Sequence, residues 1–265
     1  MINLLSIGIA SYNFKSHVPS NIPANGYVIP KENLKTQAHL NLINEWTKAN
    51  KMLLNEKKCN GMIFNFCKDY QFTCNIKIEK EDMEIIPQTK LLGVMINDSL
   101  TWDDNTKYLV QRANSRLRLL HKLVSFSVPI DDLINIYVLY VRSILEQSCQ
   151  VWHSSLTLEN ANDLERIQKN ALKIILQDEY ENYSNALSLS GLKSLIERRK
   201  ELCLRFAKAC LKNQQTNSMF PLNPISNSYD IHTRHREKFL VTKCNTTRLK
   251  NSAIPYMQSL LNTEK

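Results

Sequence analysis

Residues that interrupt regular structure are scarce in this sequence, which has 5 glycines and 8 prolines among 265 residues. This scarcity excludes low-complexity sequence and a Pro/Gly-rich linker. Long apolar runs are also missing: the apolar stretch Met1–Ala10 follows no basic region and is too short to span a bilayer. We therefore expect an intracellular protein, cytoplasmic or nuclear, that is neither secreted nor associated with a membrane.

Paired cysteines are missing as well. The chain has seven cysteines, an odd number, with no Cys-x-x-Cys pair and no repeated spacing. A disulfide framework is therefore not expected, and zinc ligands normally come in closer pairs. We predict reduced, buried thiols and no metal site. Because a Gly-rich phosphate loop and a Gly-x-Ser-x-Gly turn are also absent, no other enzyme class is indicated.

Charge and hydrophobic content are what the sequence does provide. Hydrophobic residues make up 43% of the chain, which is enough to bury the core of one or two domains. The formal net charge is +9. An excess of cations favours polyanionic partners, because binding to phosphates releases their counterions. Weak nucleic-acid binding is therefore expected.

The spacing of apolar residues divides the chain into an α+β part and a helical part. For the first part it predicts a helix at residues 31–50, short strands at 52–55 and 62–66, a hairpin of 75–79 with 83–86, and a further strand at 90–97. After Trp102 the helical period dominates and predicts helices at 103–125, 130–152, 158–177 and 193–213, with a short one at 183–189. We therefore predict an α+β fold with three parts: 1–98, a helical domain at 99–215 and a polar tail at 216–265.

Three stretches resemble the reverse transcriptases of non-LTR (LINE-type, jockey-like) retrotransposons. The first is residues 44–66, where a helix leads into Leu-Asn-Glu-Lys-Lys and then Met-Ile-Phe. The second, Thr89–Trp102, reads Thr-Lys-Leu-Leu-Gly-Val-Met-Ile-Asn-Asp-Ser-Leu-Thr-Trp and is similar to the primer-grip region of the family. The third, residues 136–175, is similar to the helices that follow the polymerase. The order and spacing of the three carry the resemblance.

The resemblance implies a truncated palm fragment at residues 1–98, with short antiparallel strands, followed by a helical thumb. It implies that Lys58 lies near the incoming nucleotide in an intact enzyme, and that Leu92 and Gly93 form the primer grip. A bare glycine backbone can lie against a primer strand. For the chain alone, two other interpretations remain open. Lys58 can be a solvated lysine in a turn, and Gly93 can be a kink in a buried strand.

The catalytic Tyr-x-Asp-Asp of the family is absent from this sequence. Nucleotide addition needs carboxylates that hold two Mg²⁺ ions roughly 3.5–4 Å apart. Asp103-Asp104 and Asp131-Asp132 are predicted to lie at helix starts, where carboxylates complement the helix dipole. We therefore expect no catalytic residue and no cofactor in this chain, although the intact family enzyme uses Mg²⁺.

Basic residues cluster in two of the predicted helices. On the helix at 103–125 the candidates for contact with a nucleic-acid backbone are Lys107, Arg112, Arg116, Arg118 and Lys122, with His121 beside them. A second cluster comprises Lys193, Arg198, Arg199, Lys200, Arg205 and Lys208. Cations also cover ordinary solvated helix faces, so phosphate contact and plain solvation both remain open.

Two hypotheses follow. One is a remnant of an RNA-directed DNA polymerase that is inactive alone and whose intact relatives bind an RNA/DNA template–primer. The other is a captured, non-enzymatic helical module that binds nucleic acid or a protein partner. The sequence leaves open the host element, the oligomeric state, the role of residues 216–265 and whether residues 1–98 fold alone.

Overall fold

The computed structural model describes residues 31–52, 54–55, 59–66, 76–79, 81–223 and 238–263. The chain divides into two compact units, Met1–Leu100 and Thr101–Lys265. The described part is mainly helical, with a few short strands.

The first unit begins with helix α1 (Lys31–Ala49), close to the range expected from the sequence. Among the described residues, six short strands follow: β1 (Asn60–Gly61), β2 (Lys77–Ile78), β3 (Glu81–Asp82), β4 (Glu84–Ile85), β5 (Gln88–Leu91) and β6 (Val94–Asn97). β1 pairs with β4 in parallel, whereas β2 with β3 and β5 with β6 form antiparallel pairs. The side-chain amide of Gln37 on α1 binds both the N–H and the C=O of Lys77, at 2.9 and 2.8 Å, which attaches the helix to β2.

Two strands predicted for this unit are wrong. At 52–55 the described residues include only an isolated bridge at Leu54, and residues 62–66 have no strand pairing. The side chains at 62–65 are only half-buried, and Phe66 is exposed. The pairing falls instead at Gly61, where a Cβ atom would lie 2.7 Å from Cδ1 of Ile85. Glycine therefore permits the close approach of β1 to β4.

The strand predicted at 90–97 is a hairpin instead. Leu91 pairs with Val94, so Leu92 and Gly93 form a two-residue turn between β5 and β6. Both turn residues have positive φ, 47° and 89° respectively. This combination matches the turn type whose twist suits a tight hairpin. The predicted hairpin of 75–79 with 83–86 is also shorter than expected, because β4 leaves it to pair with β1.

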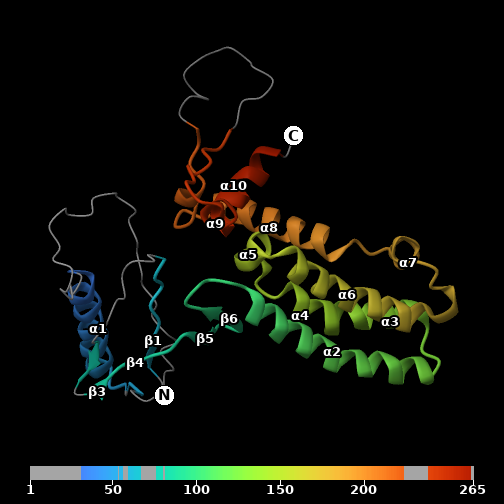
Figure 1. Ribbon diagram of the computed structural model, residues 1–265, viewed down its shortest axis with the longest axis horizontal. Coiled ribbons are helices and arrows are strands. Elements are labelled where there is room, and N and C mark those ends of the chain that lie inside the picture. The colour runs from blue at the N-terminus through green and yellow to red at the C-terminus, as the bar shows by residue number, and fades with distance from the viewer. Residues whose placement is uncertain are drawn as a thin grey trace, which may run out of the picture. The chain divides into compact units, whose positions relative to one another are not determined.

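The second unit is a helical assembly (Figure 1). Its long helices are α2 (Asp103–Ser125), α6 (Leu158–Leu176) and α8 (Leu195–Lys212), which match three predicted helices within a residue or two. Shorter elements connect them: α3 (Ile130–Ile136), the π-helix η2 (Tyr137–Arg142), α4 (Ser143–Glu146), α5 (Cys149–Trp152), η3 (His153–Ser155), η4 (Gln177–Glu179) and α7 (Tyr183–Ser190). α2 packs along α6, and α8 packs against α5 and α6.

The core of this unit lies between α2 and α6. α2 contributes Leu109, Ala113, Leu117 and Leu120 at helical spacing, and α6 contributes Leu164, Ile167, Ala171, Leu172 and Ile175. These residues are fully or almost fully buried. The two amphipathic faces found in the sequence are therefore the faces that meet, because each helix must bury its apolar stripe.

The single helix predicted at 130–152 is wrong: the segment is interrupted twice. A π-helical stretch occupies Tyr137–Arg142, and the helix ends at Gln147, where Ser148 takes a left-handed φ of 51°. Nε1 of Trp152 donates to the carbonyl oxygen of Gln147 at 3.0 Å. This bond satisfies a backbone acceptor that the interruption leaves without a helical partner.

Residues 216–265 also differ from a simple polar tail. After η5 (Asn217–Met219) and α9 (Thr247–Lys250), helix α10 (Ala253–Thr263) packs against α8. Its Met257, Leu260 and Leu261 join Cys203, Ala207, Cys210, Phe220 and Phe239 in one apolar cluster. The end of the described chain is thus part of the fold of the helical unit.

Candidate functional site

The outer face of α2 carries three exposed cations, Lys107, Arg118 and Lys122. Within the described ranges, none of the three has a carboxylate at ion-pair distance. At a rise of about 1.5 Å per residue, they extend over roughly 22 Å of the helix. Gln111 and Asn114 are exposed between them, so this face presents further polar side chains beside the cations. We call Lys107, Arg118 and Lys122 the α2 outer face.

Arg112 and Arg116, two of the five predicted contact residues, bind partners within the protein. Nη1 of Arg116 donates to the backbone oxygen of Tyr140 at 2.6 Å, and its guanidinium lies 4.0 Å from the Tyr140 ring centre. Nη1 of Arg112 donates to Oε1 of Gln147 at 3.4 Å. Both arginines therefore bind other helices of the unit, and the structure does not place them with the outer three.

The residues singled out in the first unit have different outcomes. Lys58 lies outside the described residues. Leu92 and Gly93 form the tip of the β5–β6 hairpin, and the Leu92 side chain is 75% exposed. The kink in a buried strand that was one interpretation of Gly93 is therefore wrong. At this tip Leu92 is exposed and Gly93 is half-buried.

The aspartate pairs lie where the sequence predicts them, in the first turns of α2 and α3. Oδ1 of Asp103 accepts a hydrogen bond from Nδ2 of Asn160 at 2.7 Å, which ties the start of α2 to the start of α6. Among the described residues, no group of three or more histidine, cysteine, aspartate or glutamate side chains is arranged to hold a metal ion. The aspartates lie at helix N-termini, where carboxylates complement the helix dipole.

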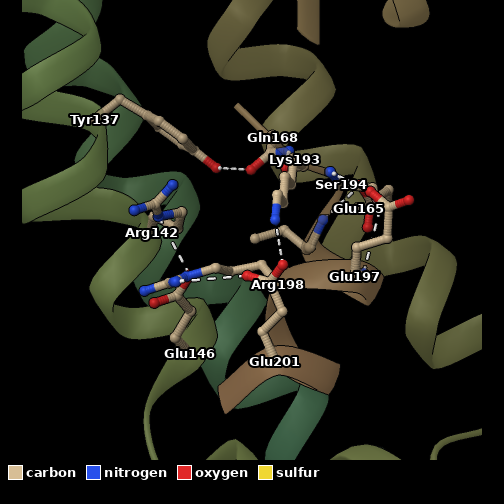
Figure 2. Close-up of polar contacts among 11 residues, drawn as sticks. Tyr137, Arg142, Glu146, Glu165, Gln168, Lys193, Ser194, Glu197, Arg198 and Glu201 are labelled. Atoms are coloured by element: carbon tan, nitrogen blue, oxygen red, sulfur yellow. Dashed lines mark hydrogen bonds and ion pairs between the residues drawn. The ribbon is translucent and has the colours of Figure 1, made fainter. Parts of the chain in front are cut away.

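Two residues of the second basic cluster, Lys193 and Arg198, are paired with acidic neighbours (Figure 2). Nε of Arg198 lies 3.1 Å from Oε1 of Glu146, and Lys193 pairs with Glu201. Nε of Arg142 lies 3.2 Å from the same oxygen of Glu146. These contacts join α4 to α8. They give Lys193 and Arg198 a structural role, whereas Lys200, Arg205 and Lys208 of the same cluster are exposed.

A buried hydrogen-bond chain lies beside these ion pairs. Tyr137 donates to Oε1 of Gln168 at 2.7 Å (Figure 2), and Nε2 of Gln168 donates to the hydroxyl of Tyr183 at 2.9 Å. The Tyr183 hydroxyl in turn donates to Glu165, whose Oε1 also accepts from the backbone N–H of Leu195 at 3.0 Å. Burial raises the pKa of both tyrosines, so both remain neutral donors. This chain of hydrogen bonds connects η2, α6, α7 and α8.

Arg199 is the most unusual polar residue of the unit because it is fully buried. Its Nε donates to Nδ1 of His153 at 3.3 Å, and its guanidinium lies 5.8 Å from the Trp152 ring centre. In the part of the chain that is described, Nη1 and Nη2 have no hydrogen-bond partner. Burial, helped by the charge of Arg199, lowers the pKa of His153 to about 4. His153 is therefore neutral and able to accept this bond near neutral pH.

Sequence patterns did not identify these buried polar residues. Glu165 and Gln168 each follow a core residue of α6, Leu164 and Ile167, directly. Two polar residues at a spacing of three, next to the apolar stripe, are a weak signal on their own. Their partners come from distant segments, which a single sequence does not bring together.

No protein-family model, curated protein or solved structure matches this chain. Among the described residues, no helix combines the length and the apolar character needed to cross a bilayer.

Proposed function

We propose that this chain is a reverse transcriptase remnant of a non-LTR retrotransposon, and that its helical unit binds a nucleic-acid backbone through the α2 outer face. The observation that carries the proposal is the set of three exposed cations without a carboxylate partner in the described ranges. The overall charge of +9 supports the same class of partner.

The proposed role is binding rather than nucleotide addition. Polymerisation requires carboxylates that can hold paired metal ions. The aspartate pairs of this chain lie in the first turns of helices, and Asp103 is bonded to Asn160. Binding to a phosphate backbone, by contrast, needs only accessible cations at intervals along a surface.

A titration of a fluorescently labelled RNA–DNA hybrid at several NaCl concentrations tests the proposal. Each phosphate neutralised contributes about 0.9 to the slope of log K against log salt for duplex DNA. We expect the triple variant Lys107→Ala, Arg118→Ala, Lys122→Ala to bind more weakly and to lose roughly two to three units of this slope if each cation contacts one phosphate.

The matched control removes the same charge from α8. Lys200, Arg205 and Lys212 are exposed, and they also comprise two lysines and one arginine. Their replacement by alanine is expected to change the slope much less. If the two triple variants weaken binding equally, net charge alone explains the affinity, and the α2 outer face has no specific role.

Exposed apolar residues support a second candidate, a module that binds a protein partner. Phe126, just after α2, and Leu139 on η2 are each 76% exposed, and Leu119 on α2 is 38% exposed. α2 and η2 pack together through Arg116 and Tyr140. If the hybrid does not bind to the wild-type chain at low salt, this candidate replaces the first.

A further inference from the structure

Cys149 on α5 and Cys203 on α8 form a buried thiol pair. Their side chains are 0% and 1% exposed, and a hydrogen bond joins the two thiols. Neither cysteine is in a disulfide. The two helices pack directly against each other, although they are far apart in the sequence. A disulfide first requires that two thiols lie close together, and the contact between α5 and α8 brings these two buried thiols to the same interface.

The cation next to this pair is Arg199, one helical turn before Cys203 on α8. Its guanidinium is fully buried, and Nη1 and Nη2 have no hydrogen-bond partner among the described residues. A buried guanidinium whose Nη1 and Nη2 groups are unsatisfied is unfavourable, whereas a neighbouring anion stabilises it. Ionisation of Cys203 would supply such an anion.

The surroundings also distinguish the two sulfur atoms. The hydrogen bond from Cys149, together with the charge of Arg199, lowers the pKa of the Cys203 thiol. The same hydrogen bond, together with burial, raises the pKa of the Cys149 thiol. Thiolates are the reactive form of cysteine. Cys203 is therefore the sulfur that reacts first with an oxidant, and Cys149 is the thiol that reacts second, with the oxidised Cys203.

Both cysteines are buried, so access to the pair requires local opening of the contact between α5 and α8. α5 has four residues, and it is bounded by Ser148 in a left-handed conformation and by the 3-10 turn η3. A short helix between two irregular segments can open without separation of α2 from α6. A small oxidant can then reach the sulfur atoms.

We propose that Cys149 and Cys203 are a peroxide-sensitive thiol pair that closes to a disulfide between α5 and α8. The Cys203 thiolate attacks one oxygen of hydrogen peroxide, which breaks the O–O bond, gives a sulfenic acid and releases hydroxide. The Cys149 sulfur then attacks the Cys203 sulfur and displaces the hydroxyl group, and its proton leaves with that oxygen as water. Two thiols lose two electrons, and one peroxide becomes two waters.

The experiment treats the folded, reduced full chain with hydrogen peroxide, then blocks the remaining thiols and digests the chain with trypsin. Cys149 and Cys203 fall in separate tryptic peptides, residues 143–166 and 201–205, each with one cysteine. We expect mass spectrometry to find these two peptides linked, and a thiol reductant to separate them. The linkage is expected to form at least about ten times faster than any oxidation of Cys210, which is buried on the same helix.

Single variants separate the two roles. In Cys149→Ser, Cys203 is expected to accumulate sulfenic acid that dimedone labels; in Cys203→Ser, Cys149 is expected to remain a thiol. Cys210→Ser is the matched control and should leave the linkage unchanged. The mapping of the wild-type chain does not depend on how these variants fold. Linkage that appears only in denaturant, or that joins other cysteines equally fast, would overturn the proposal.

Discussion

Glu146 on α4 and Arg198 on α8 form an ion pair in which Oε1 and Nε are 3.1 Å apart and the side chains are 14% and 24% exposed. Nε of Arg142 lies 3.2 Å from the same oxygen. One carboxylate therefore sits between two arginines in a largely dry environment. This cluster links α4 to α8, next to the direct packing of α5 on α8.

Loss of the Glu146 charge should destabilise the helical unit. In Glu146→Gln two partly buried guanidinium groups lose their common anion. Removal of one partner from a buried ion pair lowers stability by more than the intact pair contributes, because the remaining charge stays buried without compensation. We expect the free energy of unfolding to fall by about 2–3 kcal/mol in urea titrations followed by circular dichroism.

An exposed pair serves as the control for this variant. Asp163 and Arg166 are paired at 3.0 Å on α6, but the arginine is 63% exposed. Asp163→Asn should cost less than about 1 kcal/mol. Equal losses in the two variants would show that the Glu146 cluster is no more important than a surface contact.

Acidification should weaken the fold through His153. Burial lowers the pKa of this imidazole to about 4 in the folded chain, against roughly 6.5 in an unfolded chain. Between these values the unfolded state binds a proton that the folded state does not. Stability from this group is therefore fully present above about pH 6.5 and is lost as the pH falls toward 4.

The variant His153→Gln tests this dependence because an amide oxygen can still accept the hydrogen bond from Arg199 without titrating. We expect its melting temperature to fall less than that of the wild-type chain between pH 6.5 and 4. His121→Gln, at an exposed position, should keep the wild-type profile. Identical slopes for all three chains would exclude His153 as the cause.

Two neighbouring arginines of α2 are expected to respond in opposite ways. Arg116→Ala removes the bond to the Tyr140 backbone and the contact with its ring, and should cost about 1–2 kcal/mol of stability. Arg118→Ala should leave stability within about 0.5 kcal/mol of wild type and weaken binding to an RNA–DNA hybrid. Thermal denaturation and anisotropy titrations on both variants measure the contrast. If Arg118→Ala proves less stable than Arg116→Ala, the assignment of Arg116 to packing and of Arg118 to binding is wrong.

The long helices were predictable because their signal is local. α2 starts at Asp103 and ends at Ser125, as its apolar spacing predicts, and Gly191 ends α7 in a left-handed conformation. In these cases a short stretch of sequence contains both the apolar stripe and the residues that end the helix.

The interruptions and the site were not predictable for the opposite reason. No glycine or proline marks the turn at Gln147–Ser148, and the carbonyl left open there finds Trp152 instead. Whether a cation is free also depends on distant residues: Arg198 is neutralised by Glu146, whereas Arg118 has no such neighbour in the described ranges. α10 was missed because its apolar residues lie within a polar stretch, and the residues that they pack against, on α8 and at Phe220 and Phe239, are distant in the sequence.

The turn at Leu92–Gly93 offers a stabilising substitution. Leu92 has φ 47°, a conformation that costs a leucine about 1–2 kcal/mol, while its side chain is 75% exposed and buries little. Asparagine tolerates this conformation and commonly precedes glycine in such turns. Leu92→Asn should therefore slow amide hydrogen exchange in β5 and β6 by a factor of about three to ten, because a gain of roughly 0.6–1.4 kcal/mol in opening free energy has that effect.

Gly93→Ala, at φ 89°, should accelerate exchange in the same strands. Faster exchange in Leu92→Asn would mean that the leucine side chain contributes more at the hairpin tip than its exposure indicates.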